Sequence, residues 1–307
     1  MNVRETKDRL AKRALGLIAL FVLSLAFLMA YGLFTRSRPV LEGRGVLELL
    51  TSTSWHPAQG SFGLGVFITG TLWVTAIAML IAVPLSLPTA LYLSEYASLR
   101  FRELARPVVD VLAGISPVVY GVWGVLVIVP AVRDWLMPFL SSSFPFFPFA
   151  SDNFTGFSAI SGGIVLAVMV VPIMISVMEE VLRSIPFEIR EASLALGATK
   201  WQTTRKVVLR KAWPGVIAAV ILGFSRATGE TMAVLMVAGC ALQVAPRSIF
   251  DPAYPLPALI ANTYGEMMSV PLYDAAVLLA ALVLFVLTIL FNAGGWGILL
   301  HVERRQR

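Results

Sequence analysis

Two ionisable residues stand four positions apart inside a long apolar run of this 307-residue chain. They are Arg226 and Glu230, and the other residues of the segment 223–234 are apolar or carry hydroxyl groups. Arg226 follows Pro214 by 12 residues, so a helix rising 1.5 Å per residue would carry it about 18 Å into a hydrocarbon core of roughly 30 Å. A charge at that depth costs at least about 2.5–3.5 kcal/mol, and such residues normally face a protein interior or an aqueous cavity.

Two interpretations of this pair are open. On a continuous helix, residues i and i+4 share a face, and a mutual ion pair could simply fix the packing of the span. Alternatively, Arg226 belongs to an anion site on a permeation path, because its planar fork of donors suits a tetrahedral oxyanion. Glu230 would then orient Arg226 or accept a hydrogen bond from a protonated phosphate, and would repel sulfate, which has no proton to donate. Ser225, Thr228 and Thr231 are further donors if they face the same cavity.

The composition indicates which elements hold this pair. The chain is 58% hydrophobic and only 14% charged, whereas soluble domains carry about a quarter charged residues. Apolar runs of roughly 20 residues cross a bilayer as helices, because lipid offers no partner to a free backbone amide. We therefore predict an all-α polytopic bundle of about six spans: 14–34, 64–92, 108–131, 158–178, 215–240 and 273–298. The first run exceeds the usual length of a cleaved signal peptide and is expected to be a retained anchor.

The distribution of Lys and Arg predicts the orientation of the spans. With the N-terminus inside, the segments 1–13, 93–107, 179–214 and 299–307 are cytoplasmic and hold 5, 3, 7 and 3 basic residues, 18 together. The outer loops 35–63, 132–157 and 241–272 hold 3, 1 and 1. Because cytoplasmic loops carry the excess of Lys and Arg, both termini are expected in the cytoplasm.

Five prolines fall inside three of the predicted spans. Proline removes an amide donor and kinks a helix, which a membrane tolerates where neighbours or water satisfy the freed carbonyls. Either ordinary packing or a bundle that bends between two states explains them. They are Pro84, Pro88, Pro117, Pro130 and Pro172.

The 36-residue segment 179–214 predicts a structured connector. Pro186 suits the first turn of a helix, which would end at Gly197. Thr199 and Gln202 form the pattern of a capping box, which predicts a second short helix, and Pro214 leads back into the membrane. The pair would make a rigid knob, or would lie on anionic lipid through its basic residues. At the start of the segment, Glu179, Glu180 and Arg183 are expected to form an ordinary charged cytoplasmic face. Asp110, at the cytoplasmic start of the third span, is expected to be a solvated carboxylate at the membrane interface.

Residues 191–198, Glu-Ala-Ser-Leu-Ala-Leu-Gly-Ala, resemble the EAA loop of ABC-importer permeases. Ser193 stands where that motif usually has Ala. The resemblance implies the type I importer permease fold and a coupling helix that sits in a groove of a separate ATPase subunit. The coupling residues carried over by this resemblance are Glu191, Ala192, Leu196, Gly197 and Ala198.

The chain lacks the G-x-x-x-x-G-K-[ST] phosphate loop, so it is not expected to hydrolyse ATP or to be an enzyme. Cys240 is the single cysteine, and the two histidines lie far apart at positions 56 and 301. No metal site and no bound cofactor are therefore expected; ATP and magnesium would belong to a partner ATPase.

Residues 226–234, Arg-Ala-Thr-Gly-Glu-Thr-Met-Ala-Val, resemble a motif of the PstC-type permeases of phosphate-specific importers. The segments 70–72, 92–97 and 114–121 are similar to the same family, although Ser116-Pro117 inverts its usual Pro-Ser. The similarity runs from about residue 55 to 298. It implies a second related permease (PstA type), two ATP-binding subunits (PstB type) and an extracytoplasmic phosphate-binding protein (PstS type).

The expected organisation is an anchor helix with an outer loop (1–63), a permease domain (64–298) and a cytoplasmic tail (299–307). The expected function is ATP-driven import of inorganic phosphate across the cytoplasmic membrane by alternating access. A permease for another oxyanion, such as sulfate or molybdate, shares the connector pattern. A secondary transporter driven by protons through Glu230, or a sensory subunit that carries nothing, does not explain the connector motif and the Arg226–Glu230 pair together.

Overall fold

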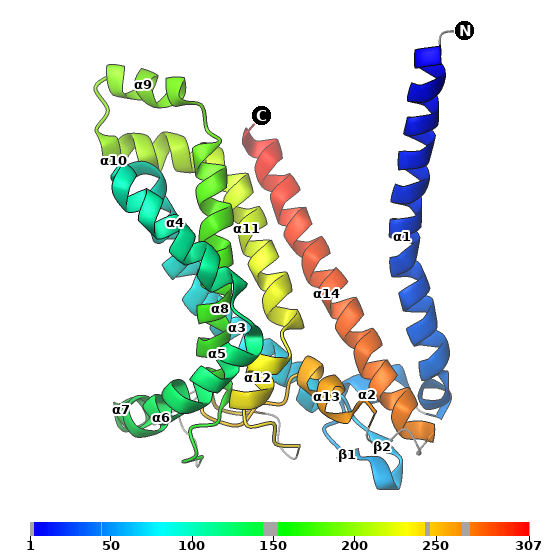
Figure 1. The fold of residues 1–307 in the computed structure, drawn as a ribbon. Coiled ribbons are helices and arrows are strands. Elements are labelled where there is room, and N and C mark those ends of the chain that lie inside the picture. The colour runs from blue at the N-terminus through cyan, green and yellow to red at the C-terminus, as the bar shows by residue number, and fades with distance from the viewer. Residues whose placement is uncertain (1–2, 44, 144–152, 243–245, 266–270, 307) are drawn as a thin grey trace.

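The computed structural model describes residues 3–43, 45–143, 153–242, 246–265 and 271–306, which form a helical bundle (Figure 1). Within them, six helical stretches are long and apolar enough to cross a membrane, which confirms the predicted all-α class. These stretches are Leu10–Gly43, Gly65–Tyr96, Pro117–Ser143, Ala159–Arg183, Lys200–Gly229 and Leu272–Val302.

Several of these stretches are chains of shorter helical elements. The elements before the fourth span are α1 (Val3–Gly43), α2 (Val46–Thr51), β1 (Trp55–His56), η1 (Pro57–Gln59), β2 (Ser61–Phe62), α3 (Gly65–Leu91), η2 (Tyr92–Tyr96), α4 (Leu99–Gly114), α5 (Pro117–Trp123), η3 (Gly124–Ile128), α6 (Val129–Ala131), η4 (Val132–Leu136) and α7 (Met137–Ser143). The remaining elements are α8 (Ala159–Arg183), α9 (Phe187–Ala195), α10 (Lys200–Thr203), η5 (Thr204–Val208), α11 (Leu209–Gly229), α12 (Met232–Val237), α13 (Leu256–Thr263) and α14 (Pro271–Gln306).

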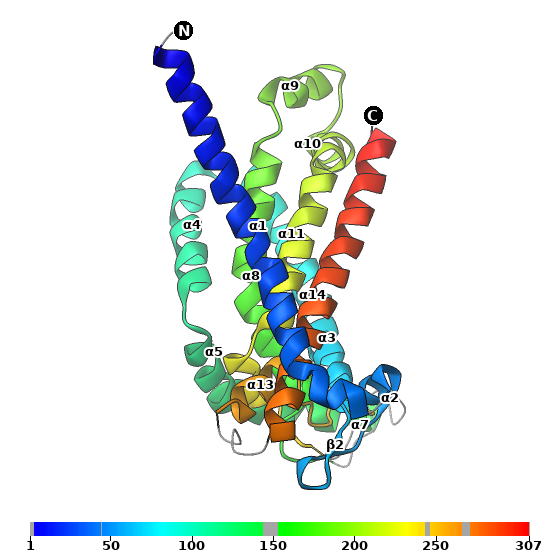
Figure 2. The same cartoon turned by 90° about the vertical axis from the view of Figure 1, so that its right-hand side faces the viewer.

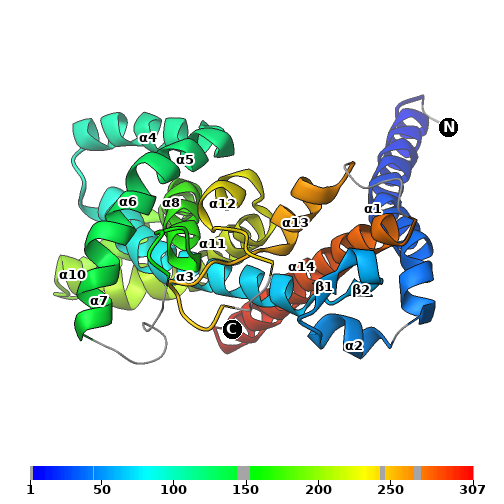
Figure 3. The same ribbon diagram turned by 90° about the horizontal axis from the view of Figure 1, so that it is seen from below.

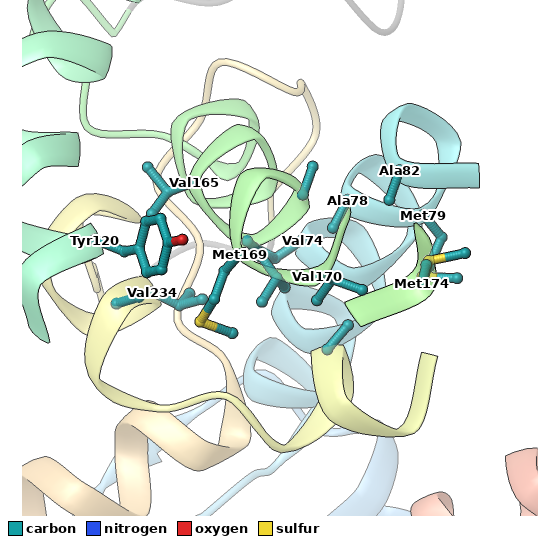
Figure 4. Packing of buried hydrophobic residues seen from close by; sticks show 14 of the residues in the cluster. Val74, Ala78, Met79, Ala82, Tyr120, Val165, Met169, Val170, Met174 and Val234 are labelled. Atoms are coloured by element: carbon teal, nitrogen blue, oxygen red, sulfur yellow. The ribbon is translucent and has the colours of Figure 1, made fainter. Parts of the chain in front are cut away.

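The centre of the bundle is the contact between α3 and α8. Small residues allow a close approach of the two backbones: a Cβ atom on Gly163 would lie 2.5 Å from Cγ2 of Ile77. Met169 of α8 and the two flanking side chains Tyr120 of α5 and Val234 of α12 belong to the same buried cluster (Figure 4). The cluster thus joins α8 to the segment that follows Glu230.

A second apolar cluster ties α1 and α14 to the short elements between the first two spans. β1 and β2 form an antiparallel hairpin in which Trp55 faces Phe62. The Trp55 ring packs edge-on against Phe67 of α3, with centroids 5.1 Å apart, and against Tyr273 of α14, at 6.0 Å. This end of the bundle is therefore held by aromatic packing.

The molecule has two ends, each with its own set of elements. The start of α1, the end of α14 and the pair α9–α10 lie at one end, opposite the hairpin, α12 and α13 (Figures 1 and 2). Seen from the hairpin end, α1 and α2 lie beside α14, and α4 to α7 lie on the other side of α3 (Figure 3). An even number of crossings places both ends of the chain on one side, as the six-span prediction requires.

The third span differs from the predicted 108–131. Ile115 and Ser116 have extended backbone angles that end α4, and α5 begins with Pro117 in its first turn. Proline disfavours helical geometry at the residue before it and suits a first helical turn. The apolar helical stretch then continues to Ser143, so the first part of the loop predicted at 132–157 is helical.

Candidate functional site

The predicted fifth span, 215–240, is not a continuous helix. α11 ends at Gly229, Glu230 is extended (φ −74°, ψ 129°), and α12 begins at Met232. The prediction that Arg226 and Glu230 share one helical face was therefore wrong. The sequence signal for the break was Gly229, since glycine in a helix interior is destabilising and glycine is common at helix ends.

Arg226 and Glu230 do not form a mutual ion pair, which was one of the two interpretations of their spacing. Arg226 lies in the last turn of α11 with an exposed side chain, and Glu230 is half-buried. No ion pair or side-chain hydrogen bond to either residue is found within the described ranges. Leu222, one turn before Arg226, and Met232 beyond the break are each 49% exposed. The arginine thus belongs to an exposed face of this single chain, at the end of α11.

The three predicted hydroxyl donors do not converge on one point. The Ser225 hydroxyl lies 2.9 Å from the Ile221 carbonyl and also hydrogen-bonds with the side chain of Asn292 on α14. Thr228 is buried and donates to the Ser225 carbonyl at 3.0 Å. Thr231 is half-buried, donates to the Gly229 carbonyl at 3.3 Å, and remains beside Glu230 at the break. Of the predicted set, only Arg226, Glu230 and Thr231 stay as candidates for a common path.

The connector has the turn predicted from its sequence. α9 is followed by Gly197 with φ +83°, the left-handed conformation that glycine adopts without steric cost. Thr199 then caps α10: its hydroxyl accepts from the Gln202 amide at 3.2 Å, and the Gln202 side chain accepts from the Thr199 amide at 3.0 Å. The predicted capping box is confirmed.

Ser193, the residue that departs from the EAA motif, makes a contact within the connector. The Ser193 hydroxyl lies 2.9 Å from the Thr203 hydroxyl, so it joins α9 to α10 across the turn. Most of the predicted coupling residues are exposed around this turn: Glu191, Ala192, Leu196 and Gly197, with Ala198 half-buried. Leu196 is 90% exposed. These residues therefore lie on the accessible surface of the connector.

The second connector helix does not end before the membrane. α10, η5 and α11 form one uninterrupted helical stretch, Lys200–Gly229, that includes Pro214. The predicted second helix is present and lies across the axis of α11 (Figures 1 and 2), but the prediction that it ends before the membrane was wrong, because a proline kinks a membrane helix without ending it when neighbours satisfy the freed carbonyls. The result is a direct helical link between the connector and Arg226.

Sequence reasoning missed the contact that fastens α9. The Arg190 guanidinium donates to both carboxylate oxygens of Glu95, from Nη2 at 2.8 Å and from Nε at 3.2 Å. The two side chains are only 13% and 8% exposed. The two residues lie 95 positions apart, so no sequence periodicity indicates that they pair. Arg190 does directly precede the EAA motif, and Glu95 lies in the segment 92–97 that resembles the PstC-type permeases.

The expectation of an ordinary charged face at Glu179 was wrong. Its side chain is 3% exposed and accepts from Nε of Arg106 on α4 at 3.1 Å, with Nη1 of Arg183 at 3.6 Å. Asp110, one turn further along α4, accepts from the Ser176 hydroxyl at 3.3 Å. These contacts dock α4 on the end of α8, which explains why Glu179 faces inward. Among the described residues, no cluster of three or more His, Cys, Asp or Glu side chains could hold a metal ion.

The class that the fold defines is a multi-pass helical membrane protein with an exposed connector. The family described as "Binding-protein-dependent transport system inner membrane component" matches residues 82–295, and the chain belongs to that family. The family description names a binding-protein-dependent transport system, and solved structures that share the fold include chains of ABC transporters.

Named relatives cover nearly the whole chain. A phosphate transport system permease protein PstC of Xylella fastidiosa is 37% identical over 95% of this chain and 89% of its own length. A probable PstC of Methanocaldococcus jannaschii is 34% identical over 96% of both chains. A probable ABC transporter permease, YqgH of Bacillus subtilis, is 36% identical over 93% of this chain and 89% of its own.

Two solved transporters share the fold. A bacterial alginate ABC transporter matches with a TM-score of 0.58 over 94% of both chains at 16% identity. An inward-facing MetNI methionine transporter matches with a TM-score of 0.54 over 81% of this chain and 99% of its own at 19% identity. These likenesses show the fold alone.

Proposed function

We propose that the chain is a membrane-spanning subunit of an ATP-driven importer that carries inorganic phosphate by alternating access. The observation that carries the proposal is the exposed Arg226 beside a helix break within a chain whose named relatives are phosphate transport permeases. Irregular backbone at membrane depth persists only where protein or water satisfies its polar groups, and an exposed arginine there requires an aqueous cavity or a partner protein.

The proposed path lies between this chain and a second, related permease of the PstA type. Arg226 on the exposed face of α11 would meet phosphate there, with Glu230 and Thr231 at the break beside it. A guanidinium offers paired donors to an oxyanion, and Glu230 would favour an anion that still carries a proton. Ser225 and Thr228 would support the helix around Arg226, since their hydroxyls are engaged by α14 and by α11 itself.

The other proposed partners follow from the two ends of the molecule. Two ATP-binding subunits of the PstB type would hold ATP and magnesium, and one would receive the exposed turn of Glu191, Ala192, Leu196, Gly197 and Ala198. A phosphate-binding protein of the PstS type would deliver substrate at the hairpin end. The chain itself would bind no cofactor and catalyse no reaction. Residues 64–298 would form the permease domain, residues 1–63 the anchor helix with its outer loop, and residues 299–307 the tail.

Uptake of radiolabelled phosphate tests this proposal. Vesicles would hold the chain with its candidate partners, with ATP on the connector side and excess sulfate, molybdate or unlabelled phosphate as competitor. ATP-dependent uptake that only phosphate reduces is expected. Reduction by sulfate or molybdate would keep the permease and replace the substrate. Uptake without an ATPase that collapses with the proton gradient would instead support secondary transport through Glu230.

A further inference from the structure

The connector helix α9 is attached to the bundle by polar contacts. None of its residues is buried, and a cavity of about 660 Å³ lies between α9, η2 and the start of α10. A helix that buries no side chain gains little from the hydrophobic effect. The position of α9 therefore depends on individual hydrogen bonds and ion pairs.

Arg190 makes most of these contacts. Besides both oxygens of Glu95, its guanidinium reaches the last carbonyls of α8 and the turn that follows: Nη2 donates to Leu182 at 2.8 Å, and Nη1 donates to Ile185. A bidentate pair fixes orientation as well as distance, and both charges are largely withdrawn from solvent. One side chain thus joins α9, the end of α8 and η2.

Glu95 stands at a junction of four elements. The π-helical turn η2 continues α3 directly. Arg102 of α4 donates to the carbonyls of Leu93 and Ser94, each at 2.7 Å. The Lys200 amine of α10 lies 4.7 Å from the centre of the Tyr96 ring. A displacement of Glu95 therefore reaches α3, which packs against α8 and α11 and whose Val74 shares a buried cluster with Val234 of α12 (Figure 4).

We infer that the Arg190–Glu95 pair is a positioning link that carries movement of the connector into α3, so that it sets how much transport each ATP hydrolysis drives. This inference rests on the proposed function. Other routes also leave α9: the chain at both of its ends, through residues 184–186 and 196–199, the hydrogen bonds of Arg190 to the carbonyls of Leu182 and Ile185, and the Ser193–Thr203 contact into α10. The Arg190–Glu95 pair joins the connector directly to the turn that continues α3.

The test compares phosphate imported with ATP hydrolysed in vesicles that hold the whole transporter. Glu95→Gln removes the charge and keeps the shape of the side chain, and it leaves Arg190 with its carbonyl partners. The expected result is a fall of about fivefold or more in phosphate imported per ATP, within the usual size of coupling between sites, while the ATPase subunit still co-purifies. Glu103→Gln is the matched control, because Glu103 is an exposed carboxylate of α4.

A chemical cross-link in place of the Arg190–Glu95 ion pair distinguishes a role in coupling from a merely structural role. In the variant Glu95→Cys/Arg190→Cys, a flexible bis-maleimide rejoins the two positions, and a mono-maleimide serves as control. Cys240, the single native cysteine, is half-buried and is changed to serine in this variant, so that only the two introduced thiols react. Recovery of the ratio with the bis-maleimide alone is the expected outcome.

An unchanged ratio in Glu95→Gln, or no recovery after cross-linking, overturns the inference. If Glu95→Gln does not assemble, the cross-linked variant supplies the decisive ratio. Absence of ATP-dependent uptake in the unaltered transporter is a different failure, because it contradicts the proposed function. Normal uptake in the unaltered transporter, with an unchanged ratio of phosphate to ATP in the variants, contradicts only the role of the Arg190–Glu95 pair.

Discussion

At the scale of single residues, the surroundings of Arg226 are determined by its position at the end of a helix. The last carbonyls of α11 lack intrahelical partners and carry partial negative charge, which favours a cation in the last turn. Because Glu230 is extended and makes no ion pair with it, the guanidinium keeps its donors for another group. The break therefore separates two charges that a continuous helix would have paired.

Arg226→Ala is expected to lower phosphate uptake between about tenfold and a hundredfold, because a hydrogen bond to a charged group contributes about 1.5–3 kcal/mol. Arg226→Lys keeps the charge and loses the planar fork, so an intermediate value is expected. Uptake at several phosphate concentrations measures both. Arg36→Ala, an exposed arginine of α1, should change nothing, and full activity of Arg226→Ala in an assembled transporter would favour a sensory role for the chain.

Glu230→Gln is expected to weaken the discrimination against sulfate. The carboxylate repels a fully ionised anion, whereas an amide does not, so sulfate should compete with phosphate in the variant and not in the parent chain. Competition by sulfate in the uptake assay measures this. Unchanged uptake together with continued exclusion of sulfate would contradict a role for Glu230 in selectivity.

At the scale of elements, the connector combines an exposed tip with a fixed base. Gly197 and the capping box of Thr199 determine the turn, Ser193 and Thr203 join its two arms, and Arg190 fastens it to the bundle. The helical backbone continues from α10 into α11 with a change of direction between them (Figures 1 and 2), so the turn is joined through helix to Arg226. Such an arrangement suits a surface that transmits movement.

Gly197→Val is expected to reduce binding of the ATPase subunit several-fold. A β-branched residue at φ +83° costs about 1–2 kcal/mol relative to glycine, so the turn would shift and its exposed apolar tip would no longer fit. Co-purification of the ATPase subunit measures this effect. Gly32→Val is the control, since a Cβ at Gly32 of α1 meets no atom within 4 Å; equal loss in both variants would contradict a specific role of the turn.

At the scale of the whole molecule, the two ends of the bundle differ in kind. The connector end carries both chain termini and the polar links of α4, α8 and α9, whereas the opposite end is closed by aromatic packing around Trp55 (Figure 1). The basic residues gather at the connector end, where 18 of the 24 Lys and Arg residues fall in the segments assigned to the cytoplasm. Charge and shape therefore favour the same orientation.

Alkaline phosphatase fusions test that orientation. The enzyme is active only where its disulfides form, outside the cytoplasm. A fusion after residue 63 is expected to be active, and one after residue 307 inactive. The reverse pattern would place the connector outside the cell, where no ATPase could reach it.

The sequence by itself determined the number and class of the spans, because apolar length is a local property, and it located the turn at Gly197 and Thr199, because caps act over three residues. It also singled out Arg226 and Glu230 as costly charges. Their separation was decided by a backbone break at Glu230, which apolar periodicity does not register. Only the tertiary structure showed the links of Arg190 to Glu95 and of Arg106 to Glu179, since ion pairs between distant segments depend on how α3, α4, α8 and α9 pack together.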